Sequence, residues 1–149
     1  MERKATSILK VITVDDSPVI AQRLKSLLSD LNEVELLGNA ADIQSALTFI
    51  EEKQPHVVLL DIHLSHDKPR NGIDLLNALR KTYPVMKIIM LTNMSGDRYR
   101  EICKSFGADY FFDKSADFDK IPDTLMQIRT AGTSNKSDDW WGVHGNSWS

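Results

Sequence analysis

The chain has 149 residues, of which 42% are hydrophobic and 26% are charged, and its formal net charge is −3 at pH 7. This size and composition predict one globular domain with a single sizeable core. The acidic balance argues against direct nucleic-acid binding, since domains that bind phosphate backbones usually carry a basic excess. The N-terminal residues lack the apolar core of a signal peptide, and no stretch approaches the ~18 apolar residues of a membrane span, so we expect a cytoplasmic protein without a membrane partner.

Five short apolar runs predict β-strands, and a stretch with helical spacing of apolar residues follows each of them. The run at 57–60 has four large apolar residues without alternation, which is typical of a strand buried on both faces. Alternating strands and helices predict an α/β fold, a five-stranded parallel doubly wound sheet with helices on both faces and the flavodoxin-like strand order 2-1-3-4-5. The predicted strands are at about 8–14, 34–38, 57–60, 86–91 and 110–112, and the helices at about 18–31, 42–53, 73–83, 95–106 and 118–128.

Capping residues and one apolar face refine two of these helices. Ser17 and Pro18 suit the N-cap and first position of the first helix, and Gly107 suits the C-terminal stop of the fourth. The apolar residues of the fourth helix, among them Cys103 and Phe106, share one face, which we expect to be buried. The single cysteine of the chain is therefore interpreted as core packing and not as a reactive thiol.

The composition changes near residue 130, where small polar residues replace the helical pattern. We therefore expect one domain at 1–130 and a polar C-terminal tail at 131–149. This tail contains all three tryptophans of the chain. They are either exposed, bound to a partner or folded back on the domain, and the sequence does not decide among these alternatives.

Polar residues follow four of the five predicted strands directly or within two positions. Asp15 and Asp16 follow the first strand, Asp61 the third, Thr92 the fourth and Lys114 the fifth. Because the carboxyl ends of parallel strands lie at one edge of a sheet, we expect these side chains to lie close together. Each residue alone could be a helix cap, a turn former or a surface charge, but the whole set favours a chemical site.

The residue types in this set suit phosphoryl transfer. Three neighbouring carboxylates repel one another unless a cation is present, and hard oxygen ligands favour Mg²⁺. Asp61 could then act as a nucleophile toward phosphorus. Mg²⁺ and Lys114 would neutralise the oxygens of the transferred group, and Thr92 could donate a hydrogen bond to it. The predicted product is an aspartyl phosphate.

These motifs, VDDSP, VVLLDIHL, MLTN and FFDKSADF, resemble the receiver domain of two-component response regulators, the CheY-like superfamily, over about residues 8–129. The resemblance implies that Asp61 accepts a phosphoryl group from a histidine kinase or a histidine phosphotransfer protein. It also implies slow self-hydrolysis afterwards, so that the chain is not an enzyme in the ordinary sense. In the family pattern, Asp16, Asp61 and the backbone carbonyl of His63 would hold Mg²⁺ directly, and Asp15 would act largely through water.

The resemblance further implies a two-state switch. The phosphoryl oxygens would draw Thr92 inward, and Phe111, at the family's aromatic switch position, would fill the vacated space. The surface of the fourth helix, fifth strand and fifth helix would then change its affinity for an output protein of unknown identity, and a homodimer is compatible with this scheme.

The chain departs from the family pattern in the loop after the acceptor. Ser65 stands where a proline is usual, and the loop to Gly72 is about three residues longer than is common. His63 and His66 in this loop could hold a metal, although solvated side chains are the simpler interpretation, and His63 could instead alter the access of water to the phosphorylation site. Phe111 lacks the hydroxyl of the tyrosine found at this position in some members.

Three interpretations of the output remain open. The favoured one is a single-domain regulator that acts by protein contact or as a phosphorelay shuttle. A second is the receiver part of a longer DNA-binding transcription factor, for which the Lys114–Ser115 pair gives weak support. The third is a Mg²⁺-dependent phosphatase, which is disfavoured because such enzymes usually have a second aspartate where this chain has His63.

Overall fold

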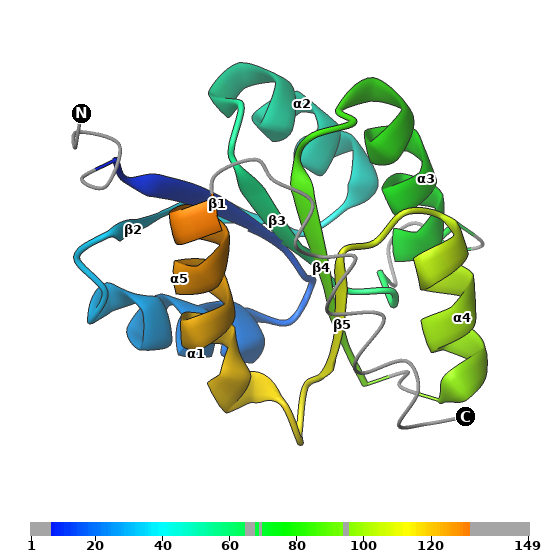
Figure 1. Ribbon diagram of the computed structural model, residues 1–149. Coiled ribbons are helices and arrows are strands. Elements are labelled where there is room, and N and C mark those ends of the chain that lie inside the picture. Colours follow the sequence, from blue (N-terminus) through cyan, green and yellow to red (C-terminus); the bar gives the residue numbers. More distant parts are fainter. Residues whose placement is uncertain (1–6, 65–67, 69, 94–95, 132–149) are drawn as a thin grey trace.

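A computed structural model of the protein describes residues 7–64, 68, 70–93 and 96–131, and it contains one five-stranded sheet in the order β2-β1-β3-β4-β5 (Figure 1). All four strand pairs are parallel, which confirms the predicted architecture and strand order. The strands are β1 (Leu9–Val14), β2 (Val34–Ala40), β3 (Val57–Leu60), β4 (Lys87–Thr92) and β5 (Tyr110–Asp113). The helices are α1 (Pro18–Ser29), α2 (Ile43–Lys53), α3 (Gly72–Thr82), α4 (Asp97–Ser105), α5 (Ile121–Ala131) and the short 3-10 helix η3 (Phe118–Lys120).

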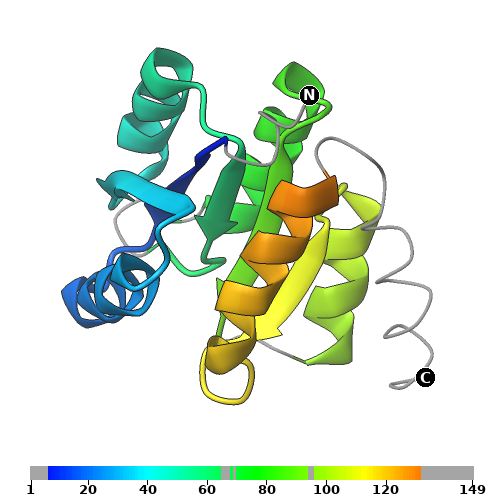
Figure 2. The same cartoon turned by 60° about the vertical axis from the view of Figure 1, so that its left-hand side comes forward.

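Helices cover both faces of the sheet, and each face has its own apolar core. α2, α3 and α4 pack on one face, while α1 and α5 pack on the other (Figures 1 and 2). All residues of β3 and β4 are buried, as expected for central strands between two helical layers. Burial of β3 on both faces therefore explains the unbroken apolar run at 57–60, as predicted from the sequence.

Three strand ends lie further along the chain than predicted. β2 continues past Gly38 to Ala40, with an irregularity in its pairing with β1 that leaves Leu37 without a register partner. β5 includes Asp113. β4 likewise includes Thr92. All three extensions add polar residues to the carboxyl edge of the sheet, where an apolar pattern alone could not mark the strand end.

The fourth helix corrects one expectation and agrees with another. Phe106 was expected on the buried face, but it is 40% exposed because it is the C-cap of α4, where the chain leaves the helical path. Gly107 follows with φ +99°, a conformation that favours glycine at a helix end. Cys103 is fully buried in the core beneath α4, as predicted.

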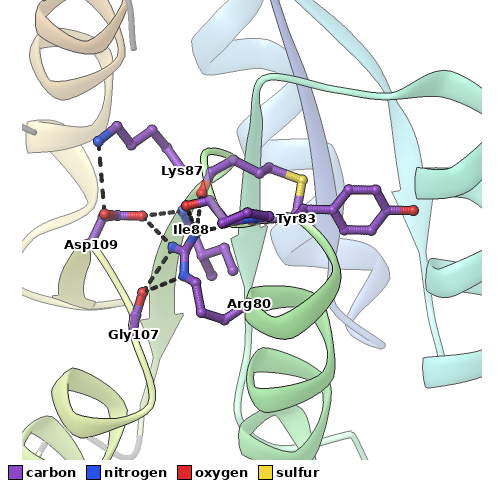
Figure 3. A network of polar contacts seen from close by, with 8 residues as sticks. Arg80, Tyr83, Lys87, Ile88, Gly107 and Asp109 are labelled. Atoms are coloured by element: carbon purple, nitrogen blue, oxygen red, sulfur yellow. Dashed lines mark hydrogen bonds and ion pairs between the residues drawn. The ribbon is translucent and has the colours of Figure 1, made fainter. Parts of the chain in front are cut away.

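A polar network holds the amino edge of the sheet between α3 and β5 (Figure 3). The Arg80 guanidinium donates to the carbonyls of Tyr83, Met86 and Gly107 at 2.7–3.1 Å, and its Nη2 lies 2.7 Å from Asp109 Oδ2. The same carboxylate oxygen accepts a hydrogen bond from the Ile88 N–H at 2.9 Å. One arginine therefore fixes the α3–β4 connection and the start of β5.

Among the described residues, no helix is long and apolar enough to cross a membrane. Ser65 and His66 in the acceptor loop, and residues 132–149 of the predicted tail, lie outside the described residues. The expected division of the chain near residue 130 remains a prediction.

Candidate functional site

Backbone hydrogen bonds between neighbouring strands bring the polar strand ends to one edge of the sheet. The Asp15 N–H donates to the carbonyl of Ala40, and the Asp61 N–H donates to that of Val14, both at 3.0 Å. The Lys114 N–H donates to the Thr92 carbonyl at 3.1 Å. Asp15, Asp61 and Lys114 therefore each follow the last residue of a strand, whereas Thr92 is itself the last residue of β4, and their positions follow from the sheet register.

Three aspartates form an acidic cluster at this edge. Asp15, Asp16 and Asp61 each offer one carboxylate oxygen, and these oxygens lie within 4.8 Å of one another. Asp15 and Asp61 are buried, with 4% and 5% of their surfaces exposed, and Asp16 is half-buried. Because buried carboxylates are costly unless they are paired or coordinate a cation, this cluster requires positive charge.

Lys114 supplies part of that charge. Its Nζ lies 2.7 Å from Asp15 Oδ2 and 2.9 Å from Asp61 Oδ2, and the residue is only 7% exposed. Burial lowers the pKa of Lys114, but the hydrogen bonds and charges of Asp15 and Asp61 outweigh burial and raise its pKa above the ordinary value. The ammonium is thus held charged between the two carboxylates.

The pKa of Asp15 is raised in this arrangement. Burial raises the pKa of Asp15, the charge of Asp61 adds to the rise, and hydrogen bonds from Lys114 and from the Ser17 N–H oppose it. Ser17 serves two structural purposes, because its N–H donates to Asp15 Oδ1 at 2.8 Å while its hydroxyl caps α1 by accepting from Ile20 N. The VDDS sequence therefore fixes the acid pair and starts the helix together.

The residues present fit a divalent cation. With all groups ionised, three carboxylates and one ammonium leave two uncompensated negative charges. The donors are hard carboxylate oxygens, which suit Mg²⁺. Asp61 Oδ2 is paired with Lys114, whereas its Oδ1 accepts, among the described residues, only a long hydrogen bond, 3.3 Å, from the His63 N–H. The cluster therefore has the donor atoms and the excess negative charge of a magnesium site.

Gly72 sets the position of the Asp61 main chain. A Cβ atom on Gly72 would lie 1.9 Å from the carbonyl oxygen of Asp61 and 2.8 Å from the Ile62 Cα. The Gly72 N–H donates to the Ile62 carbonyl at 2.6 Å, and Asn71 caps α3 by accepting from the Ile73 N–H. The start of α3 therefore packs directly against the backbone of the candidate acceptor, and glycine is required by this close approach.

Thr92 and Phe111 lie inside the domain on the same side of the site. Thr92 is fully buried at the end of β4, and Phe111 on β5 is 1% exposed. The Arg100 guanidinium of α4 lies 5.0 Å from the centre of the Phe111 ring. In this conformation the ring is already inward, so the predicted movement of Phe111 into space vacated by Thr92 stays a prediction.

Beneath Asp15 lies a polar support that the apolar pattern of the sequence did not indicate. Asn39 Nδ2 donates to the Asp15 carbonyl at 3.1 Å, and Thr13 Oγ1 lies 2.6 Å from Asn39 Oδ1. Asn39 was overlooked because β2 was expected to end at Gly38. The missed signal was a polar residue near the carboxyl end of β2, the same feature that identified the other strand ends.

A parallel sheet of order 2-1-3-4-5 with three carboxylates, a lysine and a buried threonine at its carboxyl edge defines the receiver class of α/β domains. The chain belongs to the response regulator receiver domain family, whose sequence profile matches residues 11–126.

Individual proteins give the same classification. The chain is 33% identical over 122 residues to the sensory transduction protein LytT of Bacillus cereus, a match covering 82% of this chain and 48% of that protein. It is 26% identical over 119 residues to the response regulator protein VraR of Staphylococcus epidermidis, covering 80% and 56% respectively. The chain thus spans about half the length of the curated relatives that it matches.

Solved receiver structures agree in fold. The Francisella response regulator 1452 receiver domain has a TM-score of 0.73 at 24% identity, with 83% of this chain and 98% of that chain covered. A DNA-binding response regulator of the LuxR family from Staphylococcus aureus has a TM-score of 0.72 at 23% identity, covering 82% and 99%.

Proposed function

We propose that this protein is a cytoplasmic phosphoacceptor: Asp61 receives a phosphoryl group from a histidine kinase or a histidine phosphotransfer protein, and the aspartyl phosphate switches a protein-binding surface. The observation that best supports this proposal is the buried Lys114 ammonium, which lies 2.7 Å and 2.9 Å from Asp15 and Asp61. Asp61 is therefore a carboxylate nucleophile with one cation, the Lys114 ammonium, beside it. The remaining negative charge of the site would be neutralised by a second cation.

The transfer forms a bond between a carboxylate oxygen of Asp61 and phosphorus and breaks the phosphorus–nitrogen bond of the donor phosphohistidine. The donor imidazole leaves with the electron pair and takes up a proton. Asp15, Asp16, Asp61 and the His63 carbonyl would hold Mg²⁺, which supplies electrostatic stabilisation of the transferring oxygens when bound. Lys114 neutralises a further oxygen, so the charge that develops during transfer meets fixed positive groups.

The output requires a second conformation of the domain. The phosphoryl group would accept a hydrogen bond from the Thr92 hydroxyl, and the resulting shift at the end of β4 would change the packing of Phe111 on β5. α4, β5 and α5 would then present a different surface to an output protein. The phosphoryl group can shift this equilibrium only by its difference in interaction free energy with the two conformations.

Intact-mass measurement after incubation with acetyl phosphate tests the proposal. We expect the mass of one phosphoryl group to be added in the presence of Mg²⁺, and to be absent after chelation or in Asp61→Asn. Asp97→Asn, an exposed aspartate at the start of α4, is the matched control and should label normally. Labelling of Asp61→Asn, or no labelling when a control receiver is modified under the same conditions, would overturn the proposal.

His63 is a second candidate for control of the phosphorylated state. Its side chain is exposed, and its N–H donates to Asp61 Oδ1, so the residue adjoins the proposed phosphoryl position. We propose that the imidazole alters water access and hence the lifetime of the aspartyl phosphate. An unchanged dephosphorylation rate in His63→Ala would remove this role.

The relatives bear on the form of the output. The similar structure from Staphylococcus aureus is described as a DNA-binding response regulator, and a relative from Rhizobium johnstonii, 26% identical over 126 residues, is a transcriptional regulatory protein, MctR. These likenesses favour a receiver that works with a DNA-binding effector over a stand-alone shuttle. Hydrolysis of a phosphomonoester with turnover would instead support the phosphatase alternative, and phosphorylation-dependent mass in solution would reveal a homodimer.

A further inference from the structure

A groove of about 1040 Å³ lies at the amino edge of the sheet, opposite the acidic cluster. The starts of β1 and β4, the residues before β3 and the C-terminal ends of α2, α3 and α5 surround it. Much of its lining is apolar or aromatic, including Ile8, Pro55, Tyr83, Pro84, Val85 and Ile128. Its volume is in the range of sites that bury small ligands or a few large side chains.

Two side chains at this groove are exposed although they are apolar. Val85 is 63% exposed and Ile8 is 42% exposed, and both line the groove. They are half of the large hydrophobic side chains that are exposed in the described part of the chain, the others being Val19 and Phe106. A concave surface with exposed apolar walls is typical of a binding site and not of an ordinary solvated edge.

The wall formed by the α3–β4 connection is already fixed. Arg80 donates hydrogen bonds to the carbonyls of Tyr83, Pro84 and Met86 at 3.1, 3.0 and 2.7 Å (Figure 3). Arg80 is in turn held by Asp109 at 2.7 Å. An occupant would therefore not have to order this wall, which lowers the entropic cost of binding.

The chain itself leads to this groove. Thr130 and Ala131, the last described residues, line it, so the described part of the chain ends at this groove. Trp140 and Trp141 follow Ala131 by nine and ten positions, and an extended chain of that length reaches roughly 30 Å. That reach is more than twice the ~13 Å radius of gyration of a domain of about 100 residues, so the groove is within range of both tryptophans.

The charges of the groove lining and of the residues before the tryptophan pair are opposite in sign. The two residues before the tryptophan pair are Asp138 and Asp139. Lys87 and Arg129 line the groove, and none of its described lining residues is acidic. The Arg129 Nε donates to the Ser7 carbonyl at 2.7 Å, which holds this side chain at the groove. Lys87 is buried with its Nζ 3.9 Å from Asp109, so part of its charge is already compensated and Arg129 is the more accessible of the two cations. The acidic pair is therefore complementary to the basic lining residues of the groove, and the indole rings are complementary to its apolar lining residues.

From this placement we propose that the groove at the amino edge of the sheet binds the Trp140–Trp141 pair of the same chain. The C-terminal segment would return across the end of α5, bury the two indoles between the α3–β4 connection and the start of β1, and place Asp138 and Asp139 near Lys87 and Arg129. This interaction does not depend on phosphorylation of Asp61.

Tryptophan fluorescence tests the proposal on the full chain, because all three tryptophans lie at 140, 141 and 148. We expect the folded protein to emit at shorter wavelength than the urea-unfolded chain and to resist acrylamide quenching. Val85→Glu and, on the other wall, Ile8→Glu should shift the emission to longer wavelength and increase quenching. Val19→Glu is the matched control, since Val19 is 67% exposed on α1, away from the groove, and its spectrum should equal that of the wild type.

Further variants identify the occupant. Trp148→Phe should keep the shielded emission, whereas replacing Trp140 and Trp141 by Phe should leave only a quenchable signal from Trp148. The proposal is overturned if the wild-type emission equals that of the unfolded chain, if Val19→Glu has the same effect as Val85→Glu, or if shielding disappears on dilution. The last result would show that the tryptophans bind a second copy of the chain. Thermal unfolding of each variant checks that the domain is folded.

Discussion

Replacing Gly72 by alanine should damage both the stability of the domain and its phosphorylation. The added Cβ would lie 1.9 Å from the carbonyl oxygen of Asp61, where ordinary contacts are no shorter than 3.4 Å. The obstructing atom is backbone and cannot rotate away, so either α3 or the end of β3 must move. Overpacking of a core typically costs about 1–3 kcal/mol, and a contact this short places the variant at about 3 kcal/mol.

The sign of the change in stability distinguishes a steric conflict at Gly72 from the ordinary effect of alanine in a helix. At a helical position without steric conflict, alanine in place of glycine stabilises by up to about 1 kcal/mol. For a domain of this size, a loss of about 3 kcal/mol lowers the melting temperature by roughly 10 °C. Gly96→Ala is the matched control, because no atom lies within 4 Å of its Cβ position at the start of α4, and its melting temperature should change little.

Phosphorylation of the variant should also fall, because the displaced Asp61 backbone carries the carboxylate that we propose as the phosphoacceptor. A displacement of about 1 Å can cost on the order of 10²-fold in rate. The labelling rate with acetyl phosphate and Mg²⁺ should be compared for both glycine variants at a temperature where each is folded. If Gly72→Ala is as stable as the wild type and is labelled at the same rate, the start of α3 does not pack as closely against the Asp61 carbonyl as described.

Three further predictions concern the amino edge of the sheet and the core. Arg80→Lys should lower the free energy of unfolding by about 2–3 kcal/mol in urea titration, because an ammonium cannot replace the guanidinium contacts to four carbonyls and Asp109. His56 Nδ1 accepts a hydrogen bond from the Lys10 N–H at 2.9 Å. Burial and the charge of Lys10 lower the pKa of His56 from 6.5 in the folded state. The neutral imidazole should therefore contribute about 1 kcal/mol or less to stability above pH 6.5, and this contribution should be lost as the pH falls through the folded-state pKa. Burial raises the pKa of Cys103 to about 12, so a thiol reagent should modify it only in the unfolded chain.

Each of these predictions has a control. Arg98→Lys, on the exposed surface of α4, should leave the free energy of unfolding unchanged, and an equal loss there would contradict the Arg80 argument. His56→Asn keeps an acceptor near the Nδ1 position without titrating, so its stability should lose the pH dependence that the wild type shows below pH 6.5. Rapid reaction of native Cys103 would show that the core beneath α4 opens readily.

Apolar patterning predicted most of the fold because each strand contains a short, mostly apolar run and each helix has a periodic apolar face. It failed where polar residues belong to a strand, as at Asn39 in β2, because pairing with β1 and not hydrophobicity continues that strand. It also failed at Phe106, which is the C-cap of α4 and is 40% exposed.

The candidate site was predictable in composition but not in its bonding. The topology alone brings Asp15, Asp61 and Lys114 to one edge, yet no sequence pattern shows that the lysine contacts both carboxylates. The close packing of Gly72 on the Asp61 carbonyl was equally hidden, because it depends on the path of a long polar loop. Side-chain partners and backbone approaches of this kind arise from tertiary packing.

The origin of Lys114 has a consequence for how the domain assembles. This lysine is separated from Asp61 by 53 positions and enters the sheet with β5, an edge strand that the ribosome delivers after the four others. Until that strand docks, the buried carboxylates repel one another without their internal counter-ion. A nascent or truncated chain that lacks β5 would therefore hold Asp61 in an electrostatically unfavourable setting, and the proposed phosphoacceptor site would be complete only after β5 joins the sheet.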